Sequence, residues 1–311
     1  MRLTLCGVRG SSPSSGPEFD RYGGHTSCVA VSTDGLQPSL ILDAGTGITS
    51  VTKLLGGEPF QGTILLGNLH WDHTQGLPFF SGADNPHSRV TVAVPAQGDT
   101  EAVLERIMSP PHFPITPSEL RGDWKFLGLD PGEHDVDGLR VRAVDIPHKG
   151  GRMFGYRISD GVRTFAYVSD HGPIEAGPGP KGLGEYHLAI MELAEGVDLL
   201  IHDAQYTVDE FERRAHFGHS AVDYTVGLGL KAAVKKLLLF HQTPRTATTR
   251  WTRSWPTPSS SAGTLKWKSS PRQKGRPSNS SLRTGVAAQL RLAVDSLARW
   301  CVLEAGPDQW V

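Results

Sequence analysis

A polar turn that directly follows a strand constrains the fold of this chain more than any other feature. Thr63 to Gly67 is a run of strand-forming residues, and the turn after it carries His70, Asp72 and His73 within four residues. Imidazole nitrogens and a carboxylate oxygen are ligands of zinc and similar divalent ions. A polar loop without a metal is the alternative, but a strand leading into the turn is the context that a metal motif requires. The stretch therefore predicts a metal site at the end of a strand.

Other metal-binding side chains stand at the same kind of position elsewhere in the chain. Strand-like runs at 139–146, 164–168 and 237–240 each end close to a histidine or an aspartate. Loops at the carboxyl edge of a sheet can converge on one cleft even when they are distant in the sequence. We therefore expect six ligands to gather at one edge: His70, Asp72, His73, His148, Asp170 and His241.

The motif resembles the signature of the metallo-β-lactamase superfamily, which is His-x-His-x-Asp-His at the end of a strand. The continuation from Trp71 to Pro78 is similar to the phosphodiesterase and ribonuclease Z-like branch of that superfamily. The resemblance covers residues 1–241 and implies an α/β fold, a four-layer αββα sandwich. Strand runs followed by helices, repeated twice, favour the same architecture. One position departs from the signature, because its first His is Asn68 in this chain.

The resemblance also implies how the ligands divide between two divalent ions. One ion would be bound by His70 and His148, the other by Asp72, His73 and His241, and both by the bridging Asp170. Zinc is the expected metal, and manganese is the alternative. Because an amide oxygen is a weaker zinc ligand than an imidazole, we expect Asn68 to weaken the first site.

Two downstream residues favour phosphodiester hydrolysis. His219 precedes an expected helix at 220–231, where backbone N–H groups favour an anion, and Asp203 is placed to orient its imidazole. The resemblance implies that this pair holds the phosphate and protonates the leaving oxygen, with a hydroxide bridging the two metals as the nucleophile. Asp203, His219 and the ligand Asp72 are therefore the predicted catalytic residues. The alternatives are a helix-start residue for His219 and a turn cap for Asp203.

The charge distribution bears on the substrate. The chain has 31 basic and 32 acidic residues. Residues 242–311 contain 11 of the basic and three of the acidic residues. Residues 1–241 therefore contain 20 basic and 29 acidic residues, which gives them a net charge of −9. This charge argues against a broad basic face for long nucleic acid, so we expect a small cyclic or linear nucleotide-type diester. A tRNA 3′-processing endonuclease is the second interpretation. A third is a non-catalytic nucleotide-binding relative that Asn68 and the altered C-terminus have disabled.

Residues 242–311 differ abruptly in composition from the rest of the chain, and all 13 histidines lie before them. Such a basic, Ser- and Pro-rich segment is typical of a disordered extension. We favour a shifted coding frame near Gln242. Read one base over with G+C-rich codons, the segment becomes an acidic helix start beginning Asp-Pro-Ala, which resembles the usual continuation of the family after its last metal His.

The remaining composition predicts a soluble protein of the cytoplasm. Three cysteines at no metal-ligand spacing suit a reducing compartment without disulfides. The chain has no apolar run of membrane-spanning length and no secretory leader, so no membrane partner is expected. The sequence leaves the oligomeric state open, with a homodimer as one alternative.

Overall fold

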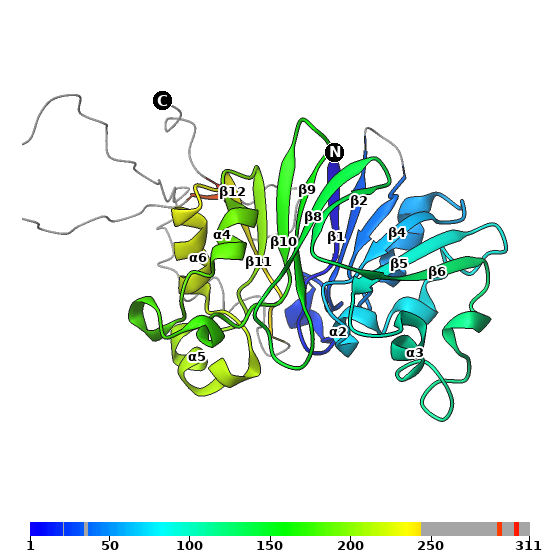
Figure 1. Ribbon diagram of the computed structural model, residues 1–311, viewed down its shortest axis with the longest axis horizontal. Helices are drawn as coiled ribbons and strands as arrows, with labels where there is room; N and C mark the ends of the chain where they lie inside the picture. The colour runs from blue at the N-terminus through cyan, green and yellow to red at the C-terminus, as the bar shows by residue number, and fades with distance from the viewer. Residues whose placement is uncertain (21, 34–36, 244–290, 294–301, 305–311) are drawn as a thin grey trace, which may run out of the picture.

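The computed structural model describes residues 1–311 except 21, 34–36, 244–290, 294–301 and 305–311. Two β-sheets stack in the middle of the protein, and helices lie on the outer side of each (Figure 1). Apolar clusters fill the space between the sheets and between each sheet and its helices. The predicted α/β four-layer sandwich is therefore confirmed.

The first sheet comes from the N-terminal part of the chain, and its strands lie side by side in chain order. They are β1 (Arg2–Gly7), β2 (Cys28–Ser32), β3 (Leu40–Leu42), β4 (Gln61–Leu65), β5 (Arg89–Pro95) and β6 (Asp123–Leu129). β3 to β6 run parallel, so their carboxyl ends meet at one edge. The helices of this half are α1 (Ile48–Val51), α2 (Trp71–Thr74) and α3 (Thr100–Glu105).

The second sheet is mixed. In spatial order it contains β13 (Arg291–Ala293), β14 (Val302–Glu304), β12 (Lys236–Phe240), β11 (Leu199–Asp203), β10 (Thr164–Val168), β9 (Phe154–Ser159), β8 (Leu139–Asp145) and β7 (Gly132–Val136). β10, β11 and β12 run parallel, and β7 to β10 pair antiparallel in succession. Its helices are α4 (Leu188–Ala194), α5 (Val208–Arg214) and α6 (Val222–Lys231).

Burial of alternate apolar residues holds the layers together. Phe154 and Phe240 belong to the cluster between the sheets, Ile48 of α1 packs under the first sheet, and Ile190 of α4 and Leu228 of α6 pack on the second. All five side chains are fully buried. Each contributes roughly 1.5–3 kcal/mol relative to an exposed position. The packed layers give the loops at the carboxyl edges a rigid base.

The elements that were not predicted from the sequence include β6, β7 and α5, as well as the short α2, β13 and β14. Most residues of β6 and β7 are exposed or half-buried, so neither strand has the continuous apolar pattern of the buried strands. The α5 helix does carry a sequence signal. Thr207 and Glu210 form a reciprocal capping box at its start, the arrangement that a Thr-x-x-Glu spacing favours.

The expectation of a frameshift or disorder in 242–311 falls mostly outside the described residues. Gln242 and Thr243 follow β12 directly, and the short strands β14 and β13 extend the second sheet beyond β12. Within the described ranges, no helix has both the length and the apolar character needed to cross a membrane.

Candidate metal centre

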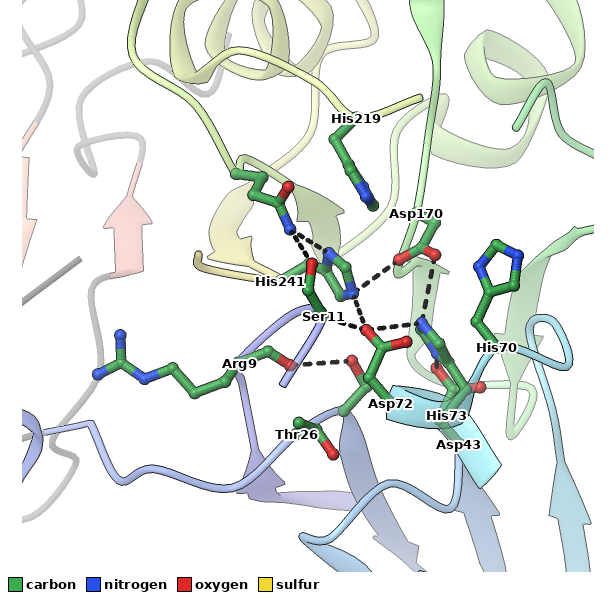
Figure 2. Close-up of polar contacts among 12 residues, drawn as sticks. Arg9, Ser11, Thr26, Asp43, His70, Asp72, His73, Asp170, His219 and His241 are labelled. Carbon is green, nitrogen blue, oxygen red and sulfur yellow. Dashed lines mark hydrogen bonds and ion pairs between the residues drawn. The ribbon is translucent and has the colours of Figure 1, made fainter. Parts of the chain in front are cut away.

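The six predicted ligands converge in one cluster although they come from separate loops. Figure 2 shows His70, Asp72, His73, Asp170 and His241 facing one another. The loop after β4 and the α2 helix carry His70, Asp72 and His73, while His148 follows β8, Asp170 follows β10 and His241 follows β12. The parallel pairing of β10, β11 and β12 brings the ends of β10 and β12 to the same edge. Loops distant in the sequence thereby supply side chains to one place.

One half of the cluster, called the inner half below, consists of Asp72, His73 and His241. Nε2 of His241 lies 2.9 Å from Oδ2 of Asp72, and Nε2 of His73 lies 3.5 Å from the same oxygen. Asp170 adds Oδ1 at 3.0 Å from Nε2 of His241 and Oδ2 at 3.2 Å from Nε2 of His73. These side chains are all buried. The inner half therefore offers four convergent donor residues.

The other half, called the outer half, consists of His70 and His148 and shares Asp170. Nε2 of His148 lies 3.3 Å from Nδ1 of His70 and 3.2 Å from Oδ2 of Asp170. The opposite nitrogens donate to backbone carbonyls, Nδ1 of His148 to Gly218 at 2.7 Å and Nε2 of His70 to Gly150 at 3.3 Å. In these tautomers the two facing nitrogens both carry lone pairs, which only a cation can bridge favourably.

The separations in both halves fit divalent ions. Ligand atoms about 2.0–2.1 Å from a tetrahedral zinc ion lie roughly 3.3–3.4 Å from one another, and the donor pairs described above are separated by 2.9 to 3.5 Å. Nε2 of His73 and Oδ1 of Asp170 are buried, and apart from the ion-pair contacts inside the cluster they have no hydrogen-bond partner among the described residues. Buried polar atoms without a partner are costly, so this arrangement favours a bound cation.

Asp43 supports the inner half from behind. Its Oδ2 accepts hydrogen bonds from Nδ1 of His73 at 2.7 Å and from the hydroxyl of Tyr167 at 2.6 Å. Its Oδ1 accepts from the backbone N–H of Gly67 at 2.6 Å. A carboxylate behind a ligand imidazole fixes its tautomer and raises its basicity. Nε2 of His73 is thereby directed into the cluster.

The N-terminal loop closes the other side of the inner half. The backbone N–H of Ser11 donates to Oδ2 of Asp72 at 2.6 Å. Gly10 lies against the ring of His241, and a Cβ at residue 10 would lie 2.4 Å from that ring. The side-chain amide of Gln205 lies 3.2 Å from Nδ1 of His241. His73 and His241 therefore each have a contact on the side away from the cluster, whereas Ser11 contacts the oxygen of Asp72 that faces the two imidazoles.

Asn68 occupies the place of the first signature His, but it is not oriented as a ligand. Its Oδ1 accepts from the backbone N–H of His70 at 2.9 Å, and its Nδ2 donates to Oδ2 of Asp170 at 2.7 Å. The flipped amide would set two donors against each other at His70 and two acceptors against each other at Asp170. The amide oxygen that the sequence suggested as a weak ligand therefore faces the backbone. A hydrogen-bond donor faces the centre instead.

The carboxylates and imidazoles of the inner half strongly shift one another's pKa. Burial alone would lower the pKa of His73 and His241, but Asp170 and the neighbouring carboxylates raise the pKa of His73 well above its usual value and that of His241 to about 10. Burial alone would raise the pKa of Asp72 and Asp170, but the facing imidazoles hold the pKa of both below the ordinary range. The inner carboxylates therefore require positive charge nearby, from protons or from a metal.

The outer half behaves differently. Burial lowers the pKa of His148 to about 4, and the attraction of Asp170 does not offset it, since His219 and His70 oppose a further positive charge. A neutral imidazole at ordinary pH is a metal ligand that needs no deprotonation.

His219 lies beside the cluster and points toward it (Figure 2). A ring nitrogen of His219 lies within 4.8 Å of ligand atoms of Asp170 and His241, and its ring stacks on that of His241 with centroids 4.9 Å apart. Nδ1 of His219 lies 3.1 Å from Oδ2 of Asp203. The fully buried Asp203 also accepts hydrogen bonds from the backbone N–H groups of His171, Gln205 and Ser220. The structure thus brings both predicted residues to the centre, with Asp203 behind His219.

An open hollow of about 390 Å³ lies over the cluster. Its walls are formed by Ser11, Leu69, His70, Trp71, Asp72, Asp170 and His219. Volumes of about 300–1,000 Å³ are typical of small-molecule sites. Three of the predicted ligands, His70, Asp72 and Asp170, therefore line one hollow of suitable size together with His219.

A family model described as a beta-lactamase superfamily domain matches residues 40–242. The match spans more than half of the chain and contains all six predicted ligands. The chain belongs to the metallo-β-lactamase superfamily. The resemblance first suggested by the turn after β4 is thereby confirmed.

Similar proteins include ribonuclease Z of Haloarcula marismortui, which is 23% identical over 290 residues covering 79% of this chain and 88% of that protein. Ribonuclease Z of Methanothermobacter thermautotrophicus is 25% identical over 297 residues covering 79% and 87%. Among solved structures, a diphosphatase of the PhnP family has a TM-score of 0.59 at 20% identity, covering 82% of this chain and 91% of that one. The short form of human tRNase Z has a TM-score of 0.57 at 19% identity, covering 79% and 94%. The structural likeness establishes the fold.

Three supporting residues were missed in the sequence. Asp43 stands just past β3 and meets the criterion that identified the ligands, so the same reasoning would have found it. Ser11 acts through its backbone N–H, which leaves no side-chain signal. The contribution of Gln205 depends on the path of the loop after β11.

Proposed function

We propose that this protein is a divalent-metal-dependent phosphodiesterase that hydrolyses a small, nucleotide-type diester. The observation that carries the proposal is the pair of His219 and buried Asp203, 3.1 Å apart, beside the metal-ligand cluster. Cleavage of a diester requires a proton at the leaving oxygen, and a positioned imidazole is the usual donor. The ribonuclease Z relatives and the PhnP-family likeness support phosphoester chemistry.

The ligand assignment follows from the two halves. The proposed inner ion is held by Asp72, His73, His241 and Asp170, and the proposed outer ion by His70, His148 and Asp170. Bound divalent ions supply a water of lowered pKa and offset charge on phosphoryl oxygens. Imidazole and carboxylate donors suit zinc, which is the proposed metal, with manganese as the alternative.

The residues of the chain then have separate roles. His219 binds a phosphoryl oxygen and gives its Nε2 proton to the leaving oxygen, while Nδ1–H donates to Asp203. Asp203 is a positioning residue, because its side chain is fully buried and acts through His219. Asp72 lines the hollow as well as the inner half, so the substrate phosphate enters directly over it.

Asn68 makes the two ions unequal in this proposal. The outer half lacks one imidazole of the family signature, and it therefore depends more on Asp170. Nδ2 of Asn68 donates to Oδ2 of Asp170, which lies 3.2 Å from Nε2 of His148 and also 3.2 Å from Nε2 of His73. That hydrogen bond draws electron density from the shared ligand. The outer ion is therefore bound more weakly than the inner ion.

The substrate preference rests on charge and size. The net charge of −9 in residues 1–241 favours a small diester over long nucleic acid. The curated ribonuclease Z relatives support an endonuclease as the second candidate. The orientation of Asn68 supports a non-catalytic nucleotide-binding relative as the third. The free thiols of Cys6 and Cys28 accord with the proposed cytoplasmic setting.

Turnover of bis-p-nitrophenyl phosphate with added zinc or manganese tests the proposal. We expect metal-dependent hydrolysis that a chelator abolishes. With a diester whose leaving group is an alcohol, which needs a proton as it departs, His219→Ala should reduce turnover by about 10²–10⁴-fold, the usual contribution of a general acid. His134→Ala, on the edge strand β7, is the matched control and should retain full activity. Tight nucleotide binding without turnover would favour the binding relative, and cleavage of a tRNA precursor alone would favour the endonuclease.

A further inference from the structure

A second hollow lies beside the metal centre and has a different character. It also measures about 390 Å³, and it lies between α2, the short 3₁₀ helix at Leu77–Phe79, and α3 with the proline-rich loop that follows. Its walls are largely apolar and include Ile107 and three aromatic side chains, Trp71, Phe79 and Phe113. A hollow of this size and lining suits a small aromatic group.

The aromatic residues are exposed to an unusual degree. Trp71 is 73% exposed and Phe79 is 59% exposed. Phe79 and Phe113 stand edge to face with ring centroids 5.7 Å apart. Large aromatic side chains gathered on one exposed surface are more typical of a binding site than of ordinary surface.

Trp71 connects this hollow to the metal centre. It lines both hollows, and it lies between the ligands His70 and Asp72 in the sequence. The backbone that positions the ligands therefore also positions the indole. A molecule with its phosphate over the metal cluster can place an attached group directly past Trp71.

We propose that this second hollow binds the planar aromatic group of the substrate, either a nucleobase or an aryl ester, and stacks it against Trp71. The inference rests on the proposed phosphodiesterase function and assigns its substrate class. Arg106 and His112 line the same hollow and supply polar contacts for ring nitrogens or carbonyl groups. Base–aromatic stacking recognises any base through its face, so shape and ring area, more than hydrogen bonds, set the preference.

Equilibrium binding to the zinc-loaded protein tests this assignment independently of turnover. Adenosine 5′-monophosphate and ribose 5-phosphate carry the same phosphate and sugar, so their affinity ratio isolates the base. We expect adenosine 5′-monophosphate to bind about tenfold more tightly, which is the size of one stacking contact. Trp71→Ala should remove most of that ratio, and Trp71→Phe should retain part of it. Leu188→Ala, which removes another exposed apolar side chain on α4, should leave the ratio unchanged.

A second pair of probes separates the two sources of the ring. Phenyl phosphate binding more tightly than methyl phosphate would extend the subsite to aryl esters, whereas a gain for adenosine 5′-monophosphate alone would assign it to nucleobases. Equal affinities for adenosine 5′-monophosphate and ribose 5-phosphate in the parent protein, or a ratio unchanged in Trp71→Ala, would overturn the proposal. So would light scattering that shows a dimer dissociated by Trp71→Ala, since the face would then be an interface between two copies.

The outcomes also distinguish this proposal from the proposed function. A Trp71-dependent ratio without any diester turnover keeps the subsite and rejects the hydrolase. Diester turnover together with equal affinities for adenosine 5′-monophosphate and ribose 5-phosphate would reject the aromatic subsite and keep the proposed hydrolase function.

Discussion

The inner and outer halves of the metal centre use the same ligand types in contrasting surroundings. In the inner half, His73 is supported by the carboxylate of Asp43, and Asp72 by the backbone N–H of Ser11. In the outer half, the supports of His70 and His148 among the described residues are backbone carbonyls, and His70 is half-exposed. Two sites with the same ligand types therefore need not bind a metal with equal affinity, because the groups hydrogen-bonded to the ligands set the charge and rigidity of those ligands.

Asn68 adds to this difference between the two halves. A histidine in its place would give the outer half a third imidazole, but the amide donates a hydrogen bond to Asp170 instead. The inner half keeps its four donor residues, while the outer half keeps two imidazoles and a shared carboxylate. We therefore expect one ion to bind tightly and the other weakly.

The largest expected effect comes from removing one ligand of each half in turn. His73→Ala should eliminate the tightly bound ion and weaken metal binding by more than about 100-fold, beyond the 10–100-fold typical of a supporting residue. His148→Ala should leave one equivalent of tightly bound metal. Elemental analysis after dialysis measures both. Retention of one tight equivalent in His73→Ala, or its loss in His148→Ala, would reverse the ranking of the halves.

A smaller effect on metal affinity is expected from Asp43, which supports His73 from behind. Asp43→Asn keeps the shape of the side chain but removes the charge that supports His73. The affinity of the tight ion should fall by about 10–100-fold. Competition with a chromophoric chelator measures this change, and Asp135→Asn on β7 serves as a control that alters a carboxylate outside the centre. An unchanged affinity would show that the charge of Asp43 does not act on the metal.

The pH dependence should also differ between the halves. His241 has a pKa raised to about 10, so it is protonated at neutral pH and must lose its proton when the inner ion binds. The affinity of the inner ion should therefore fall by about tenfold per proton for each pH unit lowered below 10. Without metal, the raised pKa contributes stability that is fully present below the ordinary value and is lost as the pH rises through 10.

His148, with its pKa lowered to about 4, has no proton to release between pH 6 and 8. Calorimetry in two buffers of different ionisation enthalpy counts the protons released in each binding event. Binding of the tightly held inner ion should release more protons than binding of the weakly held outer ion. An equal count for both events would refute the electrostatic contrast.

Much of the centre could be predicted from sequence because its ligands obey a simple topological rule. The closely spaced His70, Asp72 and His73 predict a metal site from local sequence alone. Asp170 and His241 follow buried strands whose apolar runs are easily recognised. The α/β layers follow from the same runs. The strands β6 and β7 were missed because they are largely exposed and lack that pattern.

The remaining details depend on tertiary contacts that one sequence does not encode locally. The orientation of the Asn68 amide is set by His70 on one side and Asp170 on the other, and the latter lies 102 residues away. The support of Asp72 by Ser11 uses a backbone group of a loop that lies 61 residues earlier in the chain. The sequence could identify Asn68 as unusual, but its neighbours in space determine which atom faces the candidate metal centre.

Calorimetric titration of zinc into the metal-free parent and Asn68→His, paired with diester turnover, would show whether the two halves bind metal unequally. The account predicts one tight and one weak event in the parent, a tightened second event in Asn68→His, and metal-dependent hydrolysis that rises with the second ion. Two equal, tight events in both proteins would contradict the inequality of the halves, and failure of the parent to bind zinc at all would contradict the metal centre itself.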